Sequence, residues 1–351
     1  MSFADQYYTQ EVHGPYELYE LGDFELEEGG TLRDCRLAYA TFGQLNTAKD
    51  NAIVVSTWYS GTSKIMEQVY IGPEHALNPD HYFIIVVNQL GDGLSSSPHN
   101  TPFPQGAGRF PYVRIADDVR AQHQFITEHF GLTELALVTG GSMGAQQTYE
   151  WAVRYPDMVK RAAPIAGTAK NTDHDFLFTD AIIEAIISDP DFAGGFYTDS
   201  AAVHEGLRRH AKIWAVLGWS TEFFKVEFWR KLGFSSADDF MRGFMEPYFV
   251  AMDPNNLLRM AWKWQRGDVS RHTGGDLQAA LNRIKAKVYV MPIDEDMFFP
   301  PRDCEAEQHL IPDSEYRVIQ SVCGHLALFG VDPDYIGQVD HHLSELLATP
   351  V

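Results

Sequence analysis

One short stretch constrains the fold of this chain more than any other, because it joins a strand pattern to a helix pattern through a glycine-flanked serine. Residues 135–139 are apolar on consecutive positions, as a short strand covered on both faces is. They run into 140–144, Gly-Gly-Ser-Met-Gly, and then into a helical pattern at 145–152. Glycines two residues before and after Ser142 leave room for a strained backbone at the serine. The pattern predicts a sharp turn that lifts the Ser142 hydroxyl clear of a sheet, at a helix N-terminus.

Other apolar runs repeat this strand character and alternate with amphipathic stretches. Those at 52–56, 83–87 and 288–291 are rich in β-branched residues, which predicts central parallel strands. Before the strand at 135–139, the spacing of five residues predicts a helix that Gly131 can end. These residues are Ile115, Val119, Gln122, Ile126 and Phe130. The alternation of strands and helices predicts an α/β fold.

The residue pattern changes between residues 168 and 275, where helical spacing predominates and aromatic residues are frequent. Strand character returns at 288–291. We therefore predict a discontinuous α/β core, 1–167 and 276–351, with a helical lid inserted at 168–275. The aromatic residues either form the core of this insertion or face a substrate or a partner subunit.

A nucleophilic serine needs a base to take its proton and a carboxylate to orient that base. Downstream of Ser142, the loop after the strand at 288–291 offers three acidic residues, Asp294, Glu295 and Asp296. A further predicted strand at 316–319 leads to Gly324 and His325. We predict His325 as the base and Asp296 as the acid, and Asp294 is the rival for the second role.

The negative charge that forms on a carbonyl oxygen under attack needs two backbone N–H donors. Met143 directly follows the serine at the start of the helix, so we expect its N–H to be one donor. The other is expected in the loop 57–62, after the strand at 52–56, with Tyr59 the best candidate. The side chains of Trp58 and Tyr59 either pack beneath the lid or contact the substrate.

Charge and composition exclude several classes of function. Lys and Arg number 27 against 48 Asp and Glu, a net charge of −21, and no basic stretch stands out, which argues against nucleic acid and anionic membrane partners. There is no apolar run long enough for a membrane span and no signal-like N-terminus. Three widely spaced cysteines argue against a disulfide framework and a zinc site, and the histidines lack metal-ligand spacing. We expect a cytoplasmic protein with no metal or cofactor.

These residues resemble the homoserine O-acetyltransferase branch of the α/β-hydrolase superfamily. The resemblance spans most of the chain, through the segments 37–43, 88–91, 110–122, 140–152, 189–190, 268–271, 296–301 and 324–325. It implies the α/β-hydrolase fold with a mostly parallel sheet, a Ser142–Asp296–His325 triad, a helical lid, an acyl-serine intermediate and a homodimer. It also prefers Asp296 over Asp294, because Asp296 begins the D-x-x-F-P pattern of that family.

Two departures from that branch bear on the substrate. Ile183, beside the acidic Glu184, stands where the homoserine enzymes carry an Arg that holds the substrate carboxylate. Leu326 follows the histidine, where those enzymes carry an Asp for the amino group. Apolar groups in these places would leave the charges of bound homoserine unpaired, at a cost of several kcal/mol. Trp58, Ile183 and Leu326 are therefore the predicted substrate contacts for a less polar molecule.

We expect a serine carboxylesterase that cleaves small, mostly uncharged esters. The alternative is an O-acyltransferase that passes the acyl group from acyl-CoA to an alcohol or amine other than homoserine. The lack of a basic patch disfavours a site for the CoA phosphates. A third hypothesis is a catalytically silent scaffold, which the presence of all three triad residues and both glycines disfavours.

Overall fold

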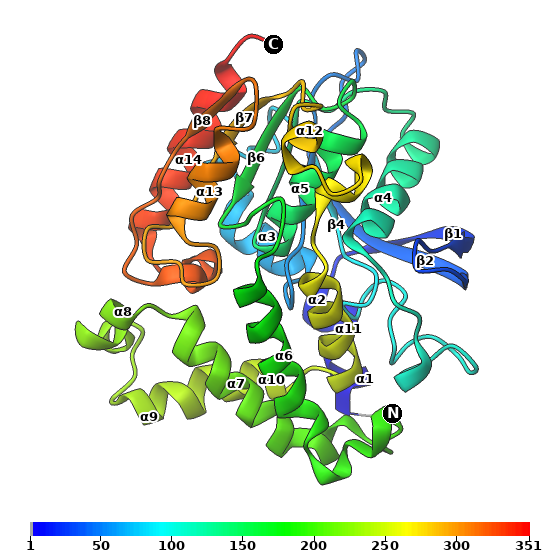
Figure 1. Ribbon diagram of the computed structural model, residues 1–351, viewed down its shortest axis with the longest axis vertical. Helices are drawn as coiled ribbons and strands as arrows, with labels where there is room; N and C mark the ends of the chain where they lie inside the picture. The colour runs from blue at the N-terminus through cyan, green and yellow to red at the C-terminus, as the bar shows by residue number, and fades with distance from the viewer. Residues whose placement is uncertain (1–2) are drawn as a thin grey trace.

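The computed structural model describes residues 3–351, which are built around one eight-stranded sheet in the order β1-β2-β4-β3-β5-β6-β7-β8 (Figure 1). The pairs β1–β2 and β2–β4 are antiparallel, and the other neighbours are parallel. This confirms the predicted α/β-hydrolase fold with a mostly parallel sheet. The strands are β1 Glu17–Glu25, β2 Thr31–Phe42, β3 Ala52–Ser56, β4 Phe83–Val87, β5 Leu137–Gly141, β6 Arg161–Ile165, β7 Lys287–Val290 and β8 Ser314–Tyr316.

The strands that are apolar on consecutive positions were predicted best. The bounds of β3 and β4 match the prediction, and every residue of both strands is buried. The strand predicted at 135–139 was wrong by two residues, since β5 ends at Gly141, immediately before Ser142. The strand predicted at 316–319 was also wrong, because β8 ends at Tyr316 and Ile319 makes only an isolated bridge to Ile293. β1 escaped prediction because most of its residues are exposed, which leaves no apolar run.

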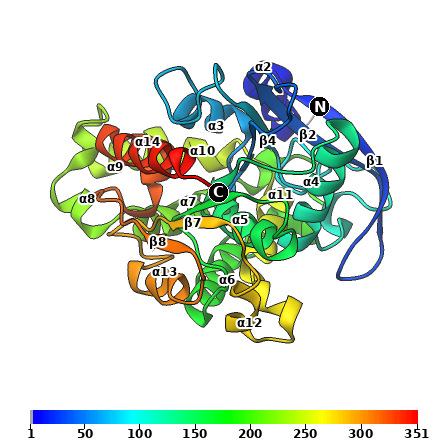
Figure 2. The same ribbon diagram turned by 90° about the horizontal axis from the view of Figure 1, so that it is seen from above.

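Helices cover both faces of the sheet (Figure 2). On one face lie α3, Ser63–Tyr70, and α14, Pro333–Ala348, which contact each other. On the other face lie α4, Ile115–His129, and α5, Met143–Arg154, together with α12, Leu277–Leu281, and α13, Pro301–Gln308. The helix α4 matches the predicted apolar spacing, and Gly131 follows it with a positive φ of 64°.

Between β6 and β7, residues 173–265 are mostly helical and gather at one end of the sheet, in the lower half of Figure 1. Its aromatic residues are largely buried against one another, for example Trp214 on Trp264 and Trp219 on Phe223. The first two helices, α1 Phe3–Tyr7 and α2 Gln10–His13, lie at the same end. The α-helices of this layer are α6 Asp173–Ile187, α7 His204–Gly218, α8 Thr221–Lys225, α9 Ala237–Phe240, α10 Glu246–Val250 and α11 Pro254–Gln265.

None of the helices formed by residues 3–351 combines the length and the apolar character needed to cross a bilayer.

Candidate active site

Ser142 occupies the turn between β5 and α5 in a strained conformation, with φ 56° and ψ −120°. Its N–H donates to the carbonyl of Ile165 on the neighbouring strand β6, at 2.9 Å. The flanking glycines serve close packing. A Cβ on Gly140 would lie 2.7 Å from the carbonyl oxygen of Ser56, and a Cβ on Gly144 would lie 2.6 Å from the same atom. The strain therefore falls on the serine, while the glycines let β3 and the start of α5 approach each other.

A buried hydrogen-bonded chain joins Ser142 to His325 and Asp296. The Nε2 atom of His325 lies 2.9 Å from Ser142 Oγ, and its Nδ1 atom lies 2.7 Å from Asp296 Oδ2. All three residues are buried. With a proton on Nδ1, the imidazole donates to the carboxylate and presents a bare Nε2 to the serine hydroxyl. This is the arrangement in which a histidine can take a proton from a serine.

Asp296 is itself held in place by the loop that carries it. Its second carboxylate oxygen accepts hydrogen bonds from the N–H groups of Phe298 at 2.8 Å and Phe299 at 3.1 Å. The rival acid, Asp294, points elsewhere, because its Oδ1 accepts the N–H of Ser321 at 2.9 Å. The structure thus brings Asp296 to the histidine and uses Asp294 to join two loops.

Ser142 and His325 open into a narrow and mostly apolar pocket. Its walls are Trp58, Tyr59, Ser60, Trp214, Met245, Phe249, Leu326, Leu328 and Phe329. The free volume of this pocket is only about 10 Å³, which leaves room for about one water molecule or a comparably small group. His325 is the only titratable group of the walls besides the Tyr59 phenol, so the pocket offers no charged partner for a substrate carboxylate or ammonium.

Of the three predicted substrate contacts, two line the pocket and one does not. Leu326 lines the pocket, as does Trp58, whose ring also contacts Tyr70 and Phe329. Ile183 lies half-buried on α6 and is not among the residues of the pocket wall. Of the predicted contacts, the structure thus brings Leu326 and Trp58 to the serine and leaves Ile183 apart.

The backbone N–H groups of Tyr59 and Met143 lie in loops that leave neighbouring parallel strands at the same edge. Ser56, at the end of β3, pairs with Gly140 of β5. Within residues 3–351, neither N–H has a hydrogen-bond partner. The Tyr59 side chain turns into the helical layer, where its hydroxyl donates to Leu257 O at 3.0 Å and its ring stacks on Trp214. Both N–H groups are thus free to bind an oxyanion.

Several pocket residues could not be named from the sequence. Trp214 on α7 and Phe249 on α10 belong to the aromatic-rich segment. The sequence shows only that aromatic residues are frequent there, and not which of them would line a pocket. Met245 and Phe329 carried no signal. Trp214, Met245 and Phe249 line the pocket because the helical layer folds back over the end of the sheet, whereas Phe329 ends the short 3-10 helix Gly324–Phe329 that carries His325.

Other reactive or metal-binding groups lie outside this pocket. Burial raises the pKa of the Cys323 thiol to about 12, which keeps it protonated and makes it a packed neighbour of the histidine loop. In the part of the chain that the structure describes, the groups that could together hold a metal ion are His341, His342 and Glu345, on the helix α14.

Comparisons with known proteins agree with this geometry. Residues 69–330 match the family model described as alpha/beta hydrolase fold. The chain is 61% identical over 346 residues to an ethyl acetate hydrolase of Pseudomonas veronii, covering 99% of both proteins. It superposes with a TM-score of 0.97 on the crystal structure of an acetylester hydrolase from Corynebacterium glutamicum, at 59% identity over 98% of this chain and 99% of that one. A homoserine O-acetyltransferase of Trichormus variabilis is 33% identical over 316 residues, 86% of each chain.

Proposed function

The chain belongs to the α/β-hydrolase family, its close relatives are esterases, and we propose that it is a serine carboxylesterase for small, mostly uncharged esters. The observation that carries the proposal is the buried chain of hydrogen bonds from Asp296 through His325 to Ser142, which ends in an apolar pocket. In this proposal Ser142 is the nucleophile, His325 its base and Asp296 the acid that orients the base.

In the proposed reaction, Ser142 Oγ attacks the ester carbonyl while His325 Nε2 takes its proton. The carbonyl oxygen becomes an oxyanion held by the N–H groups of Met143 and Tyr59. The tetrahedral intermediate collapses when His325 protonates the leaving alcohol, which leaves an acyl group on Ser142. A water molecule, deprotonated by His325, then attacks the acyl carbonyl and releases the carboxylic acid. Asp296 keeps the histidine in the required tautomer and stabilises its positive charge.

The substrate class follows from the shape and polarity of the pocket. The free space admits a group about the size of a methyl, which fits an acetyl chain better than a long acyl chain. Leu326 and the aromatic walls offer no partner for a charged acceptor such as homoserine. The names of the related enzymes, an ethyl acetate hydrolase and an acetylester hydrolase, support an acetyl ester as the substrate.

Three further features are part of the proposal. The segment 168–275 acts as the lid over the core, because its residues Trp214, Met245 and Phe249 close the pocket above Ser142. The enzyme is a homodimer and works in the cytoplasm, as the family resemblance and the unpaired cysteines suggested. Light scattering at several concentrations measures the oligomeric state, and a mass corresponding to one chain of 39.6 kDa throughout would contradict the dimer.

The first experiment follows the release of nitrophenol from 4-nitrophenyl esters of increasing acyl length, with the native enzyme and its Ser142→Ala variant. We expect continuous turnover that is fastest with acetate, and loss of turnover in Ser142→Ala by about 10⁶-fold, because the nucleophile is gone. Unchanged turnover in Ser142→Ala would contradict the proposal. A single burst of nitrophenol followed by a stall would instead favour an acyltransferase, which release of CoA thiol from acetyl-CoA with added alcohols would then test.

A further inference from the structure

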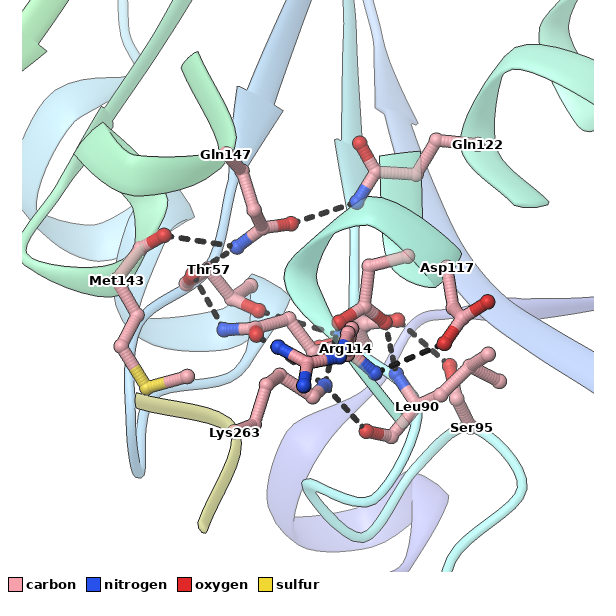
Figure 3. Close-up of polar contacts among 12 residues, drawn as sticks. Thr57, Leu90, Ser95, Arg114, Asp117, Gln122, Met143, Gln147 and Lys263 are labelled. Atoms are coloured by element: carbon pink, nitrogen blue, oxygen red, sulfur yellow. Dashed lines mark hydrogen bonds and ion pairs between the residues drawn. The ribbon is translucent and has the colours of Figure 1, made fainter. Parts of the chain in front are cut away.

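A buried ion pair connects the helical layer to the core beside the loop that carries Tyr59. Lys263 on α11, labelled in Figure 3, pairs with Asp118 on α4. Both side chains are only 1% exposed. The ammonium also donates to the carbonyl oxygen of Leu90 at 2.7 Å and lies 3.4 Å from Gln89 Oε1. The ester chemistry described above uses none of these groups. Burying two charges is costly, so the arrangement calls for a reason beyond stability.

The contact with Lys263 sets the orientation of the Gln89 amide. Because the carboxamide oxygen faces the ammonium, its NH₂ group faces the opposite way. There Gln89 Nε2 donates to the carbonyl oxygen of Thr57 at 2.8 Å and to that of Trp58 at 3.3 Å. The Trp58 carbonyl and the Tyr59 N–H belong to one planar peptide group. A hydrogen bond that fixes this carbonyl therefore also fixes the direction in which the Tyr59 N–H points.

A second glutamine binds backbone carbonyls close to the two proposed oxyanion donors. Gln147 on α5 donates from Nε2 to the carbonyl oxygen of Thr57 at 3.0 Å and to that of Met143 at 3.3 Å (Figure 3). Its own carboxamide oxygen accepts from Gln122 Nε2 at 2.7 Å, and Gln122 in turn accepts from the indole N–H of Trp151 at 2.8 Å. Every member of this chain of amides is buried, so each orientation is determined by its neighbours.

We propose that Lys263 and Gln89 are positioning residues that hold the backbone N–H group of Tyr59 in the geometry that binds the oxyanion, and that Gln147 supports them through the Thr57 carbonyl that it shares with Gln89. Lys263 lies within the helical segment, so the placement of α11 on the core becomes a condition for a competent oxyanion hole. The inference rests on the proposed function, since that function assigns the Tyr59 N–H to the reaction. None of the three side chains touches the substrate.

Gln89→Met is the first test, because methionine has a similar length and no donor. We expect kcat/KM for 4-nitrophenyl acetate to fall about tenfold to a hundredfold, which is less than the loss of a whole oxyanion donor, with little change in KM. An alkyl trifluoromethyl ketone, which forms a hemiketal with a serine hydroxyl, should lose affinity by the same factor. Inhibition by a short alcohol such as ethanol, which has no carbonyl oxygen to bind these N–H groups, should stay at the native value.

A second variant addresses the ion pair without leaving a buried charge. In the double variant Lys263→Met with Asp118→Asn, the asparagine oxygen can still accept the N–H of Leu90, which Asp118 accepts at 2.8 Å. Apolar or neutral replacement of a buried ion pair is often tolerated. We expect this variant to fold and to show the same parallel loss of kcat/KM and ketone affinity, about tenfold, because Gln89 is no longer oriented.

The matched control is Gln265→Met on the same helix, where a buried glutamine donates to the carbonyl of Phe176 away from the serine. This variant should leave both kcat/KM and the affinity for the ketone unchanged.

If Gln89→Met and the double variant keep native kcat/KM and ketone affinity, the inference is wrong. It is also wrong if rates fall while the ratio of ketone to ethanol affinity stays native, because that pattern indicates a merely structural role. Native activity in Ser142→Ala would instead overturn the proposed function itself.

Discussion

Two aspartates two residues apart show how individual side chains in one loop take different tasks. Asp296 reaches His325 Nδ1 at 2.7 Å with one oxygen and accepts two backbone N–H groups with the other. Asp294 accepts one N–H from Ser321, which ties the loop after β7 to the loop that carries the histidine. Only the first contact requires a negative charge, because only a carboxylate compensates the imidazolium that forms during the reaction.

This difference predicts opposite results for the same chemical change at the two positions. Asp296→Asn should lower kcat by about 10³–10⁴-fold, since the amide favours the wrong tautomer of His325. Asp294→Asn should retain kcat close to the native value, because the asparagine oxygen still accepts the N–H of Ser321. Steady-state kinetics on 4-nitrophenyl acetate measures both. A large loss in Asp294→Asn with native activity in Asp296→Asn would reverse the assignment of the acid.

At the scale of elements, the helical layer both fills its own core and limits the pocket. Trp214 on α7 packs on Trp264 and Phe298 while also facing the serine. The one-turn π-helix Met241–Met245 places Met245 in the pocket wall, where its sulfur accepts from the indole N–H of Trp219 at 3.2 Å. Of the two accounts offered from the sequence, core packing is confirmed for Trp214, while substrate contact stays a prediction that its place in the pocket wall supports.

Met245→Ala should widen the pocket and shift the preference toward longer acyl chains. We expect the ratio of kcat/KM for hexanoate to that for acetate to rise about tenfold, because each accommodated methylene contributes to binding. Met252→Ala is the matched control, since Met252 is equally buried but does not line the pocket. Both variants should lose about 2–5 kcal/mol of unfolding free energy. An equal change of the acyl preference in both would contradict the assignment of Met245 to the acyl site.

For the whole molecule, the contact between helical layer and core depends on buried groups that must stay in one protonation state. His210 on α7 donates from Nδ1 to the carbonyl of Ile182 at 3.1 Å, and its Nε2 atom lies 3.4 Å from the Tyr59 hydroxyl of the core loop. Burial lowers the pKa of His210 from 6.5 to about 4. The folded protein therefore keeps this ring neutral in a pH range where the unfolded chain protonates it.

This predicts that acid weakens the whole fold. Between pH 6.5 and about pH 4 the unfolded state binds a proton at His210 that the native state does not, so the unfolding free energy falls by up to about 1.4 kcal/mol per pH unit. His210→Gln should flatten this slope, whereas His341→Gln, at an exposed position on α14, should not. Urea unfolding at a series of pH values measures the slopes. Identical slopes in the native protein and His210→Gln would contradict the prediction.

Local patterns in the sequence were enough to locate β3, β4, β5 and β7, the turn at Ser142, and the predicted order of nucleophile, acid and base along the chain, whereas β6 was not predicted. These features follow from the spacing of apolar residues and glycines within about ten positions, which backbone geometry converts directly into strands, helices and turns. For the same reason β1, with few buried residues, and the ends of β5 and β8 escaped prediction.

The selection among chemically equal candidates depended on packing between distant segments. From the residues alone Asp294 and Asp296 were rivals, and only the folded loop brings the second to His325. Met245 and Phe249 line the pocket because the helical layer folds over the sheet, and Lys263 meets Asp118 across a separation of 145 residues. Such contacts leave no periodic trace along the chain, because they arise from how helices and strands pack in space rather than from the spacing of residues within them.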